Sequence, residues 1–352
     1  MARLSPREVE VLHLVAQQLT NAEIGGRLHI SVRTVESHVA ALIRKLELDN
    51  RRALVAFAVE EATRAQMPPE VETRFVRSNG AYIAYQVMGT DPPDALLVLD
   101  GVVPLETTLE EPSLRSFVER LASVSRLIRM DRRGLGLSDP VSVAAPPTIQ
   151  QWAADAVAVL DAVGARRPIM LGLAEGCTVT AFLAALHPER VGGLVLVHPV
   201  PGLESPFPGD PGLIQRHRQM VEARYEESWR QGDVPGDLMT FAPSRANDPS
   251  YRRWLLRSFR KASRPQSAPA LFDVLHRADV AAMIDRIRVP TLVIHRSGNR
   301  YVEPSYSKWV VSRIPGARYV ELAGEDHVPY VGDVEPVLTA IERFLKGAQS
   351  AR

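Results

Sequence analysis

The chain has 352 residues, of which 45% are hydrophobic and 24% charged, and its formal net charge is +1. This length predicts two domains or one large domain with an appendage, and the charge excludes a global field that recruits nucleic acid or membrane. The single cysteine, Cys177, excludes an internal disulfide framework and a cysteine-based zinc site, and it suits a reducing compartment. No signal peptide and no membrane-spanning apolar run are found, so we expect a cytoplasmic protein that does not bind membranes.

The N-terminal residues predict a bundle of short helices. The segments LSPRE (residues 4–8) and TNAE (20–23) each place Ser or Thr three residues before Glu, which is the pattern of a capping box at a helix start. A third helix is expected over 31–46 and a fourth over 51–62, each with apolar residues at helical spacing. The two prolines of QMPPE (66–70) predict a linker, because a helix cannot continue through them.

Beyond residue 71, strands alternate with helices. Asn79-Gly80 predicts a type I′ hairpin turn. Buried strands are expected at 95–99, 126–130, 169–173, 194–198, 291–295 and 319–322. Helices are expected at 112–123, 149–163, 176–187, 304–314 and 334–346. This alternation predicts a mostly parallel sheet with helices on both faces, interrupted by a polar insertion from about residue 202 to 285.

The first forty-odd residues resemble the LuxR/GerE-type helix-turn-helix DNA-binding domain over its whole length. The matching positions are Leu4, Glu8, Val11, Leu12, Asn21, Glu23, Ile24, Leu28, Ser31, Arg33, Thr34, Val35, His38, Val39, Lys45 and Leu46. The resemblance implies that the third helix enters the major groove of double-stranded DNA. We place this all-α domain at residues 1–66.

Several side chains are expected to hold the DNA backbone. Thr20 and Asn21 begin the second helix, where N–H groups and the helix dipole attract phosphate. Further phosphate contacts, which set the register without reading sequence, are expected from Arg33, Thr34, Arg44 and Lys45.

The face of the third helix that would read bases carries Glu36, Ser37 and Ala40. Many relatives have Lys where Glu36 and Ala40 stand. Glu36 can accept a hydrogen bond from a cytosine amine, but it repels phosphate, so we expect weak non-specific binding and an unusual operator. Thr34 and His38 have an alternative role in capping and packing, which we prefer for His38.

A DNA-binding module this small usually acts as a dimer, because one helix contacts few base pairs. Leu54, Val55 and Ala58 of the fourth helix are the expected seam of a homodimer. Packing of the same residues on the first helix of their own chain stays open, and the two roles are compatible.

Residues 71–347 resemble the α/β-hydrolase fold. The segments that carry the resemblance are RMDRRGLGLSD (129–139), LGLAEGCTV (171–179), ALHPERVGGLVLV (185–197), VPTLVIHRSGNRYVEP (289–304) and GARYVELAGEDHVPYVGD (316–333). We therefore expect a linker at 67–71 and a hydrolase-like domain at 72–348, with a helical lid at about 203–283.

Two of the three catalytic positions that the resemblance implies hold inert residues. The nucleophile position is Ala174, the acid position is Asn299, and only the histidine, His327, is present. A hydrolase of this kind needs a nucleophile, a base and an orienting carboxylate. Cys177 is expected to be a small core residue, and no cluster has metal-ligand spacing, so we expect no metal and no cofactor.

What remains is a pocket at the carboxyl ends of the strands. The main-chain N–H groups of Val102 and Glu175 are expected to form an oxyanion-type site beside Ala174. His327 can hold a carbonyl or carboxylate there, while His198 either lines the cavity or is a satisfied core residue. Glu175 could serve as a base on water, but no second group is placed beside it.

We therefore expect a transcriptional regulator whose silent hydrolase-like domain senses a small ligand with a carbonyl or acid group. Two alternatives stay open. The first is an enzyme with residual or different hydrolase activity and a DNA-binding appendage. The second is a hydrolase-like domain used only for dimerisation or for docking a protein partner.

Overall fold

The computed structural model describes residues 4–66, 71–99, 101–199, 219, 238–278 and 281–350. The chain divides into two compact units, Met1–Pro69 and Glu70–Arg352. Each unit has hydrophobic clusters of its own, and each is described separately below. No helix among these residues is both long enough and apolar enough to span a membrane.

The N-terminal unit consists of α1 (Pro6–Ala16), α2 (Asn21–Leu28), α3 (Val32–Lys45) and α4 (Arg51–Gln66). Both expected capping boxes are present. Ser5 accepts a hydrogen bond from the Glu8 N–H, and Thr20 accepts one from the Glu23 N–H, while each glutamate accepts from the backbone N–H of its partner. These reciprocal bonds satisfy N–H groups that have no partner inside the helix, and they fix where α1 and α2 begin.

A tight turn joins α2 to α3. His29 ends α2 in the left-handed region with φ 52°. A Cβ atom on Gly25 would lie 2.9 Å from the Ile30 carbonyl oxygen, so the turn can only close around glycine. Ser31 then caps α3 by accepting from the Thr34 N–H. This is the helix-turn-helix that the resemblance implied.

The fourth helix packs inside its own unit. Leu54 is fully buried and Ala58 is 2% exposed, and both belong to the cluster that contains Val11, Val15 and Leu42. The expected intramolecular packing of this helix is therefore present for Leu54 and Ala58, whose apolar surface is used inside the unit, while Val55 is partly buried. A homodimer that uses this helix stays a prediction.

The second unit is built on an eight-stranded sheet in the order β1-β2-β4-β3-β5-β6-β7-β8. The strands are β1 (Arg74–Ser78), β2 (Ala81–Met88), β3 (Asp94–Val98), β4 (Arg126–Met130), β5 (Ile169–Leu173), β6 (Gly193–Val197), β7 (Thr291–Arg296) and β8 (Arg318–Leu322). Strand β2 is antiparallel to β1 and β4, and all other pairs are parallel. Asn79 and Gly80 both have positive φ, which confirms the expected hairpin turn.

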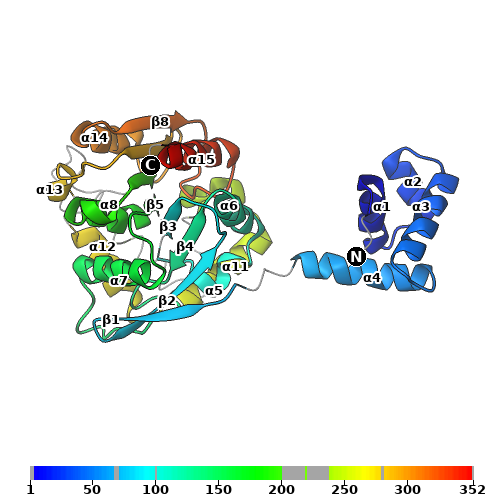
Figure 1. Ribbon diagram of the computed structural model, residues 1–352, viewed down its shortest axis with the longest axis horizontal. Coiled ribbons are helices and arrows are strands. Elements are labelled where there is room, and N and C mark those ends of the chain that lie inside the picture. The colour runs from blue at the N-terminus through cyan, green and yellow to red at the C-terminus, as the bar shows by residue number, and fades with distance from the viewer. Residues whose placement is uncertain are drawn as a thin grey trace. The chain divides into compact units, whose positions relative to one another are not determined.

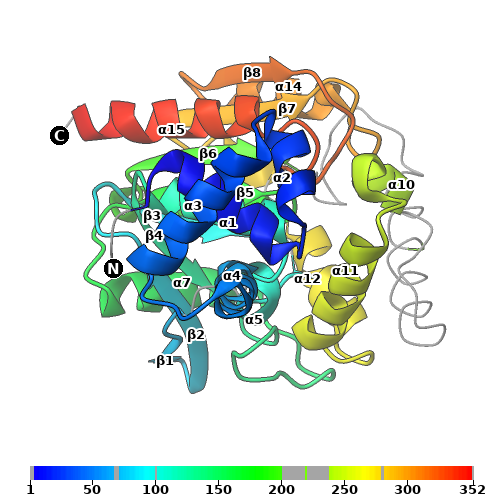
Figure 2. The ribbon, with the colours of Figure 1, turned by 90° about the vertical axis from the view of Figure 1, so that its right-hand side faces the viewer.

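Helices cover both faces of this sheet (Figure 1). On one face lie α7 (Ile149–Ala162), α8 (Gly176–Leu186) and α14 (Pro304–Arg313), with α13 (Ala281–Ile284) packed on α8. On the other lie α6 (Pro112–Ala122) and α15 (Glu335–Ser350). Helices α10 (Leu238–Phe241), α11 (Pro249–Ala262) and α12 (Ala268–Arg277) lie beyond the ends of the strands. The short helix α5 (Leu105–Thr108) contacts α11, and α15 runs beside β7 and β8 (Figure 2).

The expected α/β hydrolase fold is therefore confirmed, with most core elements within one or two residues of their expected bounds. The exceptions are α4 and α15, which each extend four residues further than expected, to Gln66 and Ser350. Much of the expected lid at about 203–283 lies outside the described residues. The part that is described contains α10, α11 and α12.

Candidate ligand pocket and DNA-binding surface

The turn between β5 and α8 has the strained geometry of a nucleophile turn, but its central residue is Ala174. This alanine has φ 51°, in the left-handed region that side chains with a Cβ atom avoid. The turn is held because the Ala174 N–H donates to the Val197 carbonyl at 2.9 Å and its own carbonyl accepts from the Cys177 N–H at 3.0 Å. A Cβ on Gly176 would lie 2.1 Å from the Val98 oxygen, so α8 starts directly against β3. A methyl group thus stands at the tip of this turn.

Cys177, three residues after Ala174, is buried and poorly placed to act as a nucleophile. Its side chain is buried, and its Sγ lies 3.1 Å from the Gly172 carbonyl oxygen, to which it donates. Burial raises the pKa of this thiol far above its ordinary value, so the thiolate is not formed near neutral pH. The expectation of a small core residue is confirmed.

Asn299 and His327 meet, and the direction of their hydrogen bond is defined. The Asn299 Oδ1 accepts from the backbone N–H groups of Tyr301 and Val302, at 2.9 and 3.2 Å. Its Nδ2 therefore points at the His327 Nδ1, 3.1 Å away, and donates to it. A neutral imidazole that accepts at Nδ1 carries its proton on Nε2, so this ring presents an N–H where a catalytic histidine presents a lone pair.

Two further histidines lie beneath this loop. His198 follows β6 and is 0% exposed. Its Nε2 accepts from the Arg296 N–H at 3.1 Å, and its Nδ1 donates to the His327 carbonyl at 2.5 Å. His295 donates from Nε2 to the Val302 carbonyl and accepts at Nδ1 from the Ser307 hydroxyl. Burial lowers the pKa of both rings, to about 4 for His295, so both are neutral at pH 7.

His198 is therefore not a ligand-binding residue. Its two nitrogens are used by the backbone of the loops that carry Asn299 and His327, and it is not among the residues that line the pocket. The satisfied core histidine, which was the alternative, is the correct description. Its position under the loop makes it a support for His327.

The loop around His327 is also held by Arg296 and Asp326. The Arg296 guanidinium, 1% exposed, donates to the carbonyls of Asp326, Val328 and Pro329. The Asp326 carboxylate accepts from the backbone N–H and the hydroxyl of Ser244. The Asp326 carboxylate thus binds Ser244, which follows α10. It does not replace Asn299 as the partner of the His327 Nδ1.

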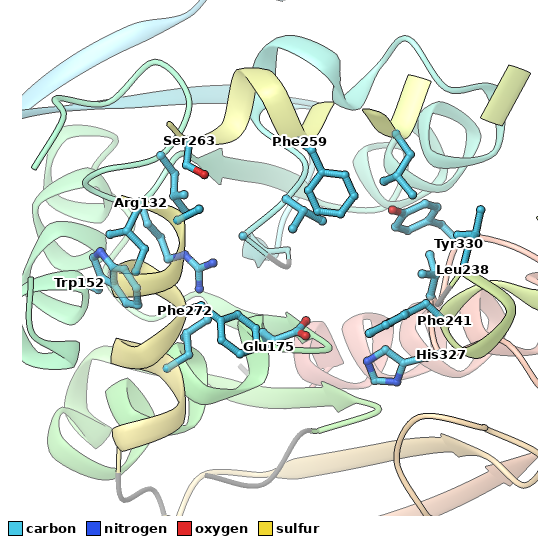
Figure 3. Close-up of a pocket in the computed structure, with 18 of the residues that line it drawn as sticks. Arg132, Trp152, Glu175, Leu238, Phe241, Phe259, Ser263, Phe272, His327 and Tyr330 are labelled. Carbon is cyan, nitrogen blue, oxygen red and sulfur yellow. The ribbon is translucent and has the colours of Figure 1, made fainter. Parts of the chain in front are cut away.

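A pocket lies above the turn, between the strand ends and helices α10, α11 and α12 (Figure 3). The space between its walls measures about 870 Å³, its opening to solvent included. The walls are mostly apolar, and their aromatic members are Trp152, Phe241, Tyr251, Phe259, Phe272 and Tyr330. A concave, aromatic site with few polar groups is typical of a small-molecule site.

The polar side chains of the pocket include Arg132, Glu175, Ser263 and His327. Figure 3 draws Arg132 and Trp152 at one end, His327 and Phe241 at the other, and the Glu175 carboxylate between them. The Arg132 guanidinium lies over the Trp152 ring at 4.8 Å from its centroid, which holds the cation against an aromatic face.

Three of the expected ligand residues, Val102, Glu175 and His327, line this pocket, whereas Ala174 is buried beside it. Sequence reasoning missed Arg132 and the aromatic walls. The run Asp131-Arg132-Arg133 after the β4 segment was a usable signal for Arg132, because successive side chains of an extended chain point to opposite sides.

In the N-terminal unit, most of the residues expected to meet DNA are exposed. Those on α3 are Arg33, Thr34, Glu36, Ser37, Ala40, Arg44 and Lys45. Several of the expected residues also have partners in the fold. Lys45 pairs with Glu8 of α1 at 2.8 Å and lowers the Glu8 pKa to about 2, Asn21 accepts from Arg51 at 2.5 Å, and Thr20 caps α2.

Comparison with known families agrees with both units. Residues 2–58 match the family of bacterial regulatory proteins called luxR, and residues 112–333 match the α/β hydrolase fold. The response regulator protein VraR of Staphylococcus aureus is 39% identical over 57 residues, which cover 16% of this chain and 27% of that protein.

Relatives of the second unit are named as esterases. Rhodomycin D methylesterase DauP of Streptomyces sp. (strain C5) is 29% identical over 284 residues, covering 71% of this chain and 91% of that protein. The solved enol-lactonase of Burkholderia xenovorans LB400 has a TM-score of 0.61 at 22% identity, over 78% of this chain and all of that one, which shows the shared fold. The chain thus belongs to the α/β hydrolase fold family and carries a luxR-family DNA-binding domain at its N-terminus.

Proposed function

We propose that this protein is a transcriptional regulator whose hydrolase-fold domain binds a small molecule and does not hydrolyse it. The observation that carries the proposal is Ala174, a methyl group at the tip of a turn that keeps its strained backbone. A bound ester or lactone would persist in such a site, so that occupancy of the pocket reports the ligand concentration.

The tautomer of His327, with its ring proton on Nε2, supports the same proposal. A general base must accept a proton at Nε2, but the Asn299 amide leaves that proton in place. The ring is then a hydrogen-bond donor at the wall of the pocket, which suits a carbonyl or carboxylate oxygen of a ligand. Val102 and Glu175 would contribute their backbone N–H groups to the same oxygen.

The N-terminal domain would bind an operator in the cytoplasm as part of a homodimer. Arg33, Thr34 and Arg44 on the exposed face of α3 would contact phosphates, and Glu36, Ser37 and Ala40 would face the bases. Lys45 and Asn21 would reach phosphate only by exchanging their present partners.

The names of the methylesterase relatives favour a second candidate, ester hydrolysis by this chain. That candidate needs a nucleophile other than Ala174, and Cys177 is buried away from the pocket. The two candidates differ in whether a bound ester leaves as product.

The test combines DNA binding with turnover. Purified protein is assayed by footprinting on the DNA that flanks its own gene, with and without a metabolite extract, and its effect on short-chain p-nitrophenyl esters is followed in parallel. We expect a protected dyad site that changes with the extract, and no hydrolysis above the buffer rate. Steady ester turnover, abolished by His327→Ala, would support the hydrolase instead. Absence of any sequence preference at moderate salt would contradict the regulator.

A further inference from the structure

A second, smaller hollow lies beside the ligand pocket, under helix α5. Its walls include Thr108 of α5, Ala262 at the end of α11, and Arg129 and Asp131 at the end of β4. It shares Gly101, Arg132 and Leu135 with the ligand pocket, so the two spaces meet at a common wall.

The guanidinium of Arg129 is the unusual group in this hollow. It is 2% exposed, and its Nη2 donates to Gln86 Oε1. Within the part of the chain that the structure describes, its Nε and Nη1 have no hydrogen-bond partner. A buried cation with unused donors is costly, and such a group normally has a carboxylate, a carbonyl or a bound ligand beside it.

The nearby Asp131 carboxylate attracts the Arg129 cation but leaves its Nε and Nη1 donors without a hydrogen bond. Asp131 is buried, and its two oxygens accept from the backbone N–H groups of Leu105 and Leu137 at 2.9 and 2.8 Å. Burial raises the Asp131 pKa to about 6 and lowers the Arg129 pKa to about 10, so Arg129 still carries its charge at pH 7.

The adjacent end of the ligand pocket is polar too. Ser263 follows Ala262, lines the ligand pocket, and has a buried hydroxyl for which the described residues provide no partner. Figure 3 shows Ser263 and Arg132 at the same end of the pocket, away from His327. Apart from Glu175 and His327, most of the remaining wall is apolar, so Arg132 and Ser263 form a polar group at this end of the pocket.

We propose that the hollow under α5 receives the carboxylate of an acidic ligand, which binds Arg129 while the apolar body of that ligand lies in the aromatic pocket. This inference rests on the proposed sensor function and names its ligand class, an apolar carboxylic acid. A carboxylate in the hollow would accept charge-assisted hydrogen bonds from the Arg129 Nε and Nη1 groups, which the described residues leave without an acceptor. The site would discriminate an acid from its amide or ester by charge.

The experiment measures binding to the full chain by isothermal titration calorimetry. The probes are phenylacetate, 4-phenylbutyrate and 6-phenylhexanoate, each paired with its primary amide, and inorganic phosphate alone. We expect at least one acid to bind about tenfold or more tightly than its amide, because a hydrogen bond to a charged group contributes that much. Phosphate alone should bind weakly, because it lacks an apolar body.

Three variants assign the preference to Arg129. Arg129→Met should reduce binding of the acid by about tenfold or more and leave the amide within about threefold. Gln86→Leu removes the partner of the guanidinium but keeps its charge, so the preference for acid should persist. Arg126→Met removes a charge from the same strand at a site that pairs with Asp94 outside the hollow, and should change neither probe.

The outcomes separate this inference from the proposed function. Equal binding of acids and amides by the unmodified protein overturns the carboxylate site and leaves the sensor standing, and it does so even if Arg129→Met fails to fold. A preference for acids that survives Arg129→Met also overturns it. Hydrolysis of the corresponding esters contradicts the sensor while the acid preference still supports the carboxylate site. Absence of binding by every probe contradicts both.

Discussion

At the scale of single residues, the direction of one hydrogen bond supports the proposal that this pocket binds a ligand without hydrolysing it. The Asn299 amide is turned by the N–H groups of Tyr301 and Val302, so it donates to His327 and leaves the ring proton on Nε2. In a serine protease, exchanging the triad Asp for Asn reduces kcat by about 10⁴, because the histidine adopts the wrong tautomer. Restoring a serine alone is therefore insufficient.

We accordingly expect Ala174→Ser to give no ester hydrolysis above the buffer rate, and Ala174→Ser with Asn299→Asp to exceed the single variant by about 10²-fold or more. Aspartate would accept from the His327 Nδ1–H and free Nε2 to act as the base. Initial rates on p-nitrophenyl acetate measure this, with Asn299→Asp alone as the control. Equal rates for Ala174→Ser alone and for Ala174→Ser with Asn299→Asp would show that the His327 tautomer does not limit ester hydrolysis.

The buried histidines under the loop make a prediction for stability against pH. Burial lowers the His295 pKa to about 4, whereas an exposed histidine in the unfolded chain titrates near 6.5. The unfolded state therefore binds more protons between these values, so stability is full above about pH 6.5 and declines as pH falls toward 4. The decline for one such group is about 1.4 kcal/mol per pH unit in this window.

Urea unfolding of the full chain between pH 4.5 and 7 measures that decline. His295→Gln should have a shallower slope than the unmodified protein whatever its absolute stability, because it removes one of the groups that must charge on unfolding. His187→Gln, at a partly exposed histidine after α8, is the matched control. Parallel slopes for all three proteins would mean that His295 does not titrate on unfolding.

At the scale of elements, local signals predicted the helices and strands, and long-range contacts decided the rest. The capping residues Ser5 and Thr20 and the Asn79-Gly80 turn act through neighbours within a few positions, so sequence alone identifies them. The pairing of Lys45 with Glu8 joins residues 37 positions apart, and the use of His198 by a distant backbone spans 129. Such contacts depend on packing and leave no periodic signal, so the sequence predicted neither the Lys45–Glu8 pair nor which of the two roles left open for His198 is the correct one.

The exposed face of α3 carries a prediction for DNA binding. Glu36 is exposed there among Arg33, Ser37 and Ala40, and its charge opposes phosphate. Glu36→Lys should tighten binding to unrelated DNA and steepen the dependence of log K on log salt concentration by about one unit per phosphate gained. Fluorescence anisotropy at several salt concentrations measures both quantities.

A matched charge change elsewhere shows whether the effect is local. Glu10→Lys reverses an exposed charge on α1, where Glu10 pairs with Arg7, and changes the net charge by the same amount. We expect a smaller change in slope for Glu10→Lys than for Glu36→Lys. Equal changes in the two variants would mean that net charge alone acts, and that α3 does not face the phosphates.

At the scale of the whole molecule, the two units have separate hydrophobic clusters but share one proposed task. Separate cores allow separate unfolding transitions, and a ligand stabilises only the unit that binds it. Coupling between the units is then a measurable free energy. If the ligand changes the affinity for operator by some factor, operator must change the affinity for ligand by the same factor.

We therefore expect calorimetry to show two transitions, of which a bound aryl carboxylate raises only that of the hydrolase-fold unit. Saturating ligand should change operator affinity by about 5- to 150-fold, and operator should change ligand affinity by an equal factor. Ala268→Phe, which fills the pocket wall at the start of α12, should abolish the ligand shift and the change in operator affinity together. If ligand raises the transition but leaves operator affinity unchanged, the domain binds its ligand without regulating DNA. A change in operator affinity that persists in Ala268→Phe would place the sensing site elsewhere in the chain.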